Sequence, residues 1–151
     1  MHARDTNFYF PTSQHPQNKN IIGIADKKRI YIYSDIFDGN MRVRESYEPT
    51  IDFHQLQVDN GILSSGDSND ITSFTFAPWD QTGNTLLVGF RNGTALLVRN
   101  AIDDNQETTI ETISGASSDS DQVNSVAFSH QQKSSYDNSN DAFFVVSHKS
   151  K

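Results

Sequence analysis

The sequence predicts an all-β protein built from a small antiparallel sheet that repeats along the chain. Three observations support this fold class. Short apolar runs alternate with turn sequences between residues 71 and 99, similar runs recur elsewhere in the chain, and polar residues gather between the runs. The chain also has ten Phe and five Tyr, which is enough large side chains for a core despite a mean hydropathy of -0.61. Short runs rich in β-branched and aromatic residues are typical of strands.

Residues 71–99 give the clearest view of the repeated unit. A strand over 71–77 ends at Pro78, because proline cannot donate a hydrogen bond to a sheet ladder. The continuous apolar run 86–90 is typical of a strand buried on both faces. Asn92-Gly93 predicts a tight hairpin turn, because both residues accept a positive φ, and 94–98 is then the return strand. The unit is therefore a three-stranded antiparallel meander.

The rest of the chain is interpreted in the same way. Further strands are expected over 7–10, 21–25, 29–33, 51–58, 108–113, 123–130 and 141–147. The polar stretches between them, including 12–20, 34–49 and 131–140, are expected to be loops.

The apolar runs repeat in order. Residues 21–33 resemble 86–98 without a gap at an offset of 65, and 123–130 restates 71–78 at an offset of 52. Residues 141–147 restate 84–90. All-β repeats of this size, with hairpin tips, favour a β-propeller. Residues 1–151 are therefore predicted to form one incomplete propeller of two to three four-stranded antiparallel blades, roughly 7–58, 71–113 and 123–151.

The central unit resembles a WD40 repeat. Ala77-Pro78 with Gly83, the run 86–89 and Asn92-Gly93-Thr94 follow the family's order of strand, turn, strand and hairpin. Residues 126–129 match the end of the family's first strand. The resemblance implies a propeller whose hairpin tips and strand starts form a face that receives peptides.

The chain also departs from the family pattern. Val98-Arg99 stands where WD40 repeats usually have Trp-Asp, and no Gly-His pair precedes Ile71 or Val123. The sequence is thus similar to the divergent propellers of large multi-subunit assemblies. The opening Ala3-Arg4-Asp5 with the Phe8-Tyr9-Phe10 run, and Phe76-Ala77-Pro78 followed by Leu87-Val88-Gly89, are similar to the N-terminal propeller of a small subunit of fungal transcription factor IIIC.

Composition narrows the possible partners. The net charge is -7, from 19 acidic and 12 basic residues, and an acidic chain repels phosphate. Direct nucleic-acid binding through this segment is therefore not expected. The chain has no cysteine, no apolar run of membrane-spanning length and no signal-peptide pattern. An intracellular protein, nuclear or cytoplasmic, is expected.

Catalytic, metal and cofactor sites are not expected either. No nucleophile elbow, phosphate-binding loop or paired-histidine motif occurs. The five histidines are dispersed and are interpreted as surface or loop residues: His2, His15, His54, His130 and His148. The acidic pairs at 103–104 and 119–121 lack the rest of a calcium loop. Trp79 is either a cap on the core or an interface anchor.

The resemblance implies that partner contacts gather on one face of the propeller. The matching positions are the hairpin tips Lys27, Lys28, Arg91 and Asn92 and the strand starts Asp70 and Gln122. The same residues could be ordinary turn residues that keep the protein soluble.

The expected function is a non-enzymatic scaffold that contacts other protein subunits within a larger intracellular complex. Two to three blades cannot close a ring, so the chain is expected to be a fragment, or to be completed by another chain, and to aggregate when it is expressed alone. The alternative is a compact β-sandwich with an uncharacterised ligand or enzymatic site.

Overall fold

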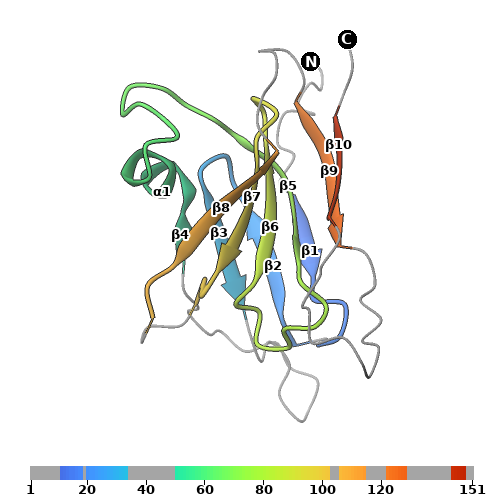
Figure 1. The fold of residues 1–151 in the computed structure, drawn as a ribbon. Helices are drawn as coiled ribbons and strands as arrows, with labels where there is room; N and C mark the ends of the chain where they lie inside the picture. The colour runs from blue at the N-terminus through green and yellow to red at the C-terminus, as the bar shows by residue number, and fades with distance from the viewer. Residues whose placement is uncertain are drawn as a thin grey trace, which may run out of the picture.

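A computed structural model describes residues 11–18, 20–33, 50–102, 106–114, 122–128 and 144–148. Ten strands and one short helix are seen in this part of the chain (Figure 1). The strands are β1 (Thr12–Gln14), β2 (Ile22–Ala25), β3 (Arg29–Tyr33), β4 (Thr50–Asp52), β5 (Ile71–Phe76), β6 (Leu86–Phe90), β7 (Ala95–Arg99), β8 (Thr109–Ser114), β9 (Val123–Phe128) and β10 (Phe144–His148). The helix is α1 (Phe53–Asp59).

The strands form three separate sheets. The first sheet has the order β1-β2-β3-β4, the second β5-β6-β7-β8, and the third contains β9 and β10. Every pairing between neighbours is antiparallel. The predicted all-β class and the four-stranded antiparallel units are therefore confirmed for the first two sheets.

The second sheet lies between the other two. Strand β1 packs beside β5, and β9 packs against both β5 and β6 (Figure 1). Val88 and Leu96 face the core shared with the first sheet, whereas Leu87 and Leu97 lie on the opposite face, and all four are at most 3% exposed. Burial on both faces explains why 86–90 is continuously apolar. A two-layer sandwich would leave one face of each sheet in solvent, so the second sheet does not fit that alternative.

The main core fills the space between the first and second sheets. Ile30 and Ile32 from β3 meet Phe76 and Phe90 from the second sheet, and all four are at most 1% exposed. At Gly23 the first sheet lies close against Phe74 of the second sheet. A Cβ atom placed there would lie 2.7 Å from Cε2 of Phe74, so only glycine fits at this crossing.

The predicted strand over 51–58 is wrong. Only Thr50–Asp52 is extended, and α1 begins at Phe53. The carboxylate of Asp52 accepts a 2.9 Å hydrogen bond from the N–H of Gln55, which is a helix N-cap. Phe53 and Gln57 are both fully buried and lie one helical turn apart. The alternating apolar residues of 51–58 are too few to distinguish a strand from a helix. Burial of Phe53 and Gln57 against the core favours the helix.

Two other predictions about the N-terminal part have different outcomes. Residues 12–14 were predicted to be loop but form β1, the edge strand that pairs with β2. The prediction is wrong because backbone pairing, and not an apolar run, defines this strand. The strand predicted over 7–10 lies outside the described residues.

The repeat between β5 and β9 has the predicted offset of 52. Both strands contain a β-bulge at the same position: the pairing register skips Thr72 in β5 and Asn124 in β9. These two residues are 52 positions apart in the chain. The correspondence thus extends to an irregularity of the backbone.

The gapless offset of 65 between 21–33 and 86–98 needs a correction. Gly23 pairs with Ser13, and Gly89 pairs with Ser73, so the equivalent residues of β2 and β6 are 66 apart. At an offset of 65, Ile22 would correspond to Leu87, which points to the other face of its sheet. A slip of one residue exchanges the two faces of a strand, so the apolar pattern alone misaligned these strands.

Candidate functional site

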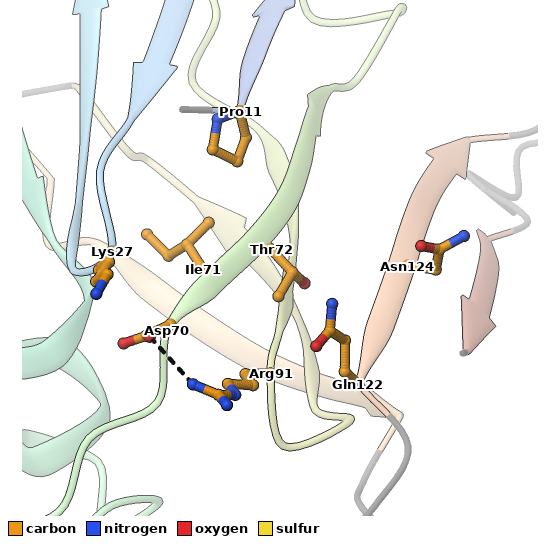
Figure 2. Close-up of a pocket in the computed structure, with 8 residues that line it drawn as sticks. All are labelled: Pro11, Lys27, Asp70, Ile71, Thr72, Arg91, Gln122 and Asn124. Atoms are coloured by element: carbon orange, nitrogen blue, oxygen red, sulfur yellow. Dashed lines mark ion pairs between the residues drawn. The ribbon is translucent and has the colours of Figure 1, made fainter. Parts of the chain in front are cut away.

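A hollow lies at the end of the molecule where the β2–β3 and β6–β7 turns meet the starts of β5 and β9 (Figure 2). Its volume is about 510 Å³. The lining residues are Pro11, Lys27, Asp70, Ile71, Thr72, Arg91, Gln122 and Asn124. All three sheets therefore contribute to its wall.

Backbone hydrogen bonds hold the wall in place. The N–H of Ile71 donates to the carbonyl of Lys27 at 2.9 Å, which joins the β2–β3 turn to the start of β5. The N–H of Arg91 donates to the carbonyl of Asp70 at 2.8 Å, and that of Ala25 donates to the carbonyl of Pro11 at 2.8 Å. Since the backbone makes these bonds, the side chains of Lys27, Asp70 and Arg91 are left for other contacts.

Turn chemistry fixes the β2–β3 tip. The carboxylate of Asp26 accepts hydrogen bonds from the N–H groups of Lys28 and Arg29 at 2.8 and 2.7 Å and from the hydroxyl of Tyr31 at 3.1 Å. Burial acts to raise the pKa of Asp26, but the hydrogen bonds and the nearby Arg29 charge together outweigh it, so the pKa is lowered. Asp26 is thus ionised at neutral pH and holds the turn that presents Lys27.

The two bulge residues form the polar floor of the hollow. Thr72 and Asn124 are each the extra residue of a bulge, and both line the hollow. Figure 2 shows the Thr72 side chain directed toward Gln122. The Oγ1 atom of Thr72 is buried and has no hydrogen-bond partner. Bulges often redirect a side chain beside a functional site, and here they place a hydroxyl and an amide at the starts of β5 and β9.

The lining carries an excess of positive charge. The guanidinium of Arg91 lies 3.9 Å from the carboxylate of Asp70, and the side chains are 72% and 23% exposed, respectively. This distance is too long for a hydrogen bond, so the pair is loose. Lys27 is exposed and forms no ion pair with any described residue. Two cations and one carboxylate therefore surround neutral polar groups.

Four of the six predicted partner-binding residues come together here: Lys27, Asp70, Arg91 and Gln122. The other two do not line the hollow. Lys28 accepts a 2.8 Å hydrogen bond from the N–H of Phe53 through its carbonyl, and so connects the turn to α1.

Asn92 belongs to a chain of buried amides behind the β6–β7 tip. Its N–H donates to Oδ1 of Asn69 at 3.0 Å, and the Asn69 amide donates to Gln57 at 2.9 Å. Gln57 then donates to the carbonyl of Phe53 at 2.9 Å. Asn69 and Gln57 are 6% and 0% exposed, so this chain ties the turn to α1 through the interior. Asn92 is therefore a structural residue of the turn.

Sequence reasoning missed four lining residues: Pro11, Ile71, Thr72 and Asn124. Pro11 directly follows the strand predicted over 7–10 and was not named as a site residue. Thr72 and Asn124 were taken as ordinary strand residues, although a signal for them exists. Ile71 and Phe74 lie three residues apart and both face the core, and this spacing breaks the alternation of a regular strand.

One of the five histidines, His15, lies in a loop directly after β1, but it is buried and not on the surface. His15 is only 2% exposed, and its Nδ1 accepts hydrogen bonds from the N–H groups of Gln17 and Asn18 at 3.0 and 3.1 Å. Its Nε2 therefore carries the proton and contacts the carbonyl of Asp80 in the second sheet. The ring lies 5.7 Å from that of Phe76. His15 thus connects two sheets at the end opposite the hollow, and it is not a surface residue.

Trp79 also lies at a junction between sheets. Its ring meets the ring of Phe128 edge-on at 5.0 Å, which joins the β5–β6 turn to β9. The residue remains 43% exposed. Trp79 therefore covers the seam between the second and third sheets and does not cap a core.

The described residues contain no group of three or more His, Cys, Asp or Glu side chains that could hold a metal ion. Within the same residues, no helix has the length and apolar character needed to span a bilayer. Comparison with protein-family models gives no match, and comparisons with curated proteins and with solved structures give none either. The resemblance to WD40 repeats and to transcription factor IIIC propellers therefore stays a prediction.

Proposed function

We propose that the chain forms successive blades of a WD40-like β-propeller and serves as a non-enzymatic docking platform for other protein subunits of an intracellular complex. The observation that carries this proposal is the hollow where hairpin tips and strand starts from three successive sheets meet. Its lining offers charges and amides on a backbone that is held by hydrogen bonds, and such groups recognise a partner segment.

The arrangement of the sheets supports the propeller. The first strands of the three sheets, β1, β5 and β9, are neighbours, as the inner strands of adjacent blades would be. Ile24 is 37% exposed on the face of the first sheet that points away from the second, and Tyr31 is partly exposed on the same face. In a propeller a further sheet covers such a face. Another part of a longer propeller, or another chain, would supply it.

Quantitative affinity capture of partner proteins tests the proposal. The bait proteins are the wild-type chain, Arg91→Glu, Asp70→Lys and the swapped double variant Asp70→Arg/Arg91→Asp. The swap keeps the two opposite charges together but exchanges their places. Partners that use the hollow should be lost with both single variants and with the swap.

Lys28→Glu is the matched control. Lys28 is an exposed cation next to Lys27, but it does not line the hollow, and its structural bonds are made by the backbone. Partners should be retained with this variant. Unchanged capture by every hollow variant would exclude the hollow as the docking site.

A further inference from the structure

The cations that the structure describes fall into two groups. Arg29 and Arg99 are paired with carboxylates on their own sheets, Asp52 at 3.6 Å and Glu111 at 3.0 Å. At the hairpin tips, Lys27 and Lys28 form no ion pair with any described residue, and Arg91 has only its loose contact with Asp70 at 3.9 Å. Positive charge is therefore less fully neutralised at the tips than on the sheets.

This pattern is notable in a chain with a net charge of -7. The lining of the hollow carries two cations against one carboxylate, so its local charge is opposite in sign to that of the whole chain. Arg91 is 72% exposed, and its contact with Asp70 at 3.9 Å leaves the donors of the guanidinium fork free. A planar fork of donors matches a carboxylate, which can accept two of its hydrogen bonds at once.

We infer that the hollow recognises an acidic side chain, Asp or Glu, within an extended segment of a partner protein, through Arg91 and Lys27. This inference rests on the proposed docking function and names its ligand class. Thr72 lines the hollow and its buried hydroxyl has no partner, so a rotation of the side chain would let it donate to the same carboxylate or to the backbone of the segment. The amides of Gln122 and Asn124 are suited to bonding a peptide backbone.

The size and charge of the site favour a single acidic side chain over a polyanion. A volume of about 510 Å³ accommodates a few side chains. A nucleic acid would bring a row of phosphates against a chain whose overall charge repels them. Asp70 in the lining further limits the negative charge that the hollow accepts.

Peptide selection tests this inference. A library of random decapeptides is selected on the immobilised chain, and the selected peptides are then labelled and titrated by fluorescence anisotropy. Peptides selected on the wild type should be enriched in Asp and Glu. Arg91→Glu and Lys27→Glu should each weaken binding by about tenfold, because a favourable charge contact is replaced by a repulsive one. Lys28→Glu should change it less than about twofold, because an exposed charge outside the site contributes little.

A change in the peptide gives a measurement that does not depend on folding of a variant. Replacing the selected Glu by Gln should weaken binding to the wild type more than it weakens binding to Arg91→Gln, in which only Lys27 remains to contact the carboxylate. Added salt should also weaken wild-type binding, because the Debye length falls from about 10 Å at 0.1 M to about 3 Å at 1 M. Trp79 emission, at the opposite end of the molecule, reports whether each variant is folded.

The outcomes separate this inference from the proposal on which it rests. Peptides that need the hollow but show no acidic preference would overturn the inference and leave the docking function standing. Binding only after the acidic residue is replaced by a phosphoserine would also overturn it, in favour of phosphate. If no selected peptide responds to any hollow variant, the docking function fails as well.

Discussion

Replacing Gly89 by alanine tests the packing of the third sheet on the second. A Cβ atom at residue 89 would lie 2.3 Å from Cγ1 and 2.9 Å from Cβ of Val123 in β9, and 3.0 Å from Oγ of Ser73. A rotation of the Val123 side chain can relieve the first contact but not the second. Strand β9 therefore has to move away from the second sheet.

The cost follows from these contacts. Overpacking a well-packed interior costs about 1–3 kcal/mol, so Gly89→Ala should lower the free energy of unfolding by about 2 kcal/mol. Val123→Ala removes two methyl groups from a side chain that is 0% exposed, which should cost about 2 kcal/mol. The double variant relieves the 2.3 Å contact, so it should lose about 1 kcal/mol less than the sum of the two single variants.

Trp79 gives a direct assay. It is the only tryptophan of the chain, and its ring contacts Phe128 of β9 at 5.0 Å. Urea titrations followed by Trp79 fluorescence and by far-UV circular dichroism separate undocking of β9 from unfolding of the whole chain. In Gly89→Ala, the fluorescence transition should come first.

Gly66→Ala is the control for this experiment, because a Cβ atom there meets no atom within 4 Å. It should change the free energy of unfolding by no more than about 1 kcal/mol. Wild-type stability and wild-type Trp79 emission in Gly89→Ala, or strict additivity in the double variant, would refute the packing of β9 on this face.

Three further predictions concern the first sheet and the turns. Because the pKa of Asp26 is lowered in the folded state, its ionised form stabilises the fold above about pH 4. This stabilisation is lost as the pH falls through the folded-state pKa. The difference in free energy of unfolding between wild type and Asp26→Asn, measured by urea titration, should therefore shrink between pH 7 and pH 3. Ile24→Thr should change the free energy of unfolding by less than about 0.5 kcal/mol, whereas Ile30→Thr should lower it by about 2–4 kcal/mol in the same titration. Equal effects would contradict the placement of Ile24 on the outer face and Ile30 on the core face of the first sheet. Asn69→Ala leaves Oε1 of Gln57 and the N–H of residue 92 without their partners, so thermal unfolding should show a loss of about 2–3 kcal/mol. An unchanged melting temperature would contradict the buried amide chain.

Sequence reasoning predicted the strands well where the signal is local. The runs 29–33 and 86–90 and the Asn92-Gly93 turn were located because apolar runs and turn residues act over a few positions. It failed where tertiary contacts decide, as in 53–59, which became helical because Phe53 and Gln57 are buried together.

The candidate site was predicted only in part, for a physical reason. Lys27, Asp70 and Arg91 were named because they match the hairpin tips and strand starts of the WD40 repeats that the sequence resembles. Lys28 has the same residue type and lies beside Lys27, yet its carbonyl is bonded to α1. Which of two adjacent turn residues faces the hollow depends on the turn geometry set by Asp26, and composition does not reveal that geometry.

The bulges at Thr72 and Asn124 connect the repeat to the site. The apolar residues of β5 are Ile71, Phe74 and residue 76, and those of β9 are residues 123, 126 and 128. In both strands the second apolar residue follows the first by three positions, and the third follows the second by two. A regular strand places residues three apart on opposite faces, and an extra residue in a bulge returns them to one face. The spacing is therefore the sequence signal of the bulge. Since each bulge places its extra residue in the lining of the hollow, the feature that breaks the strand pattern also forms part of the site.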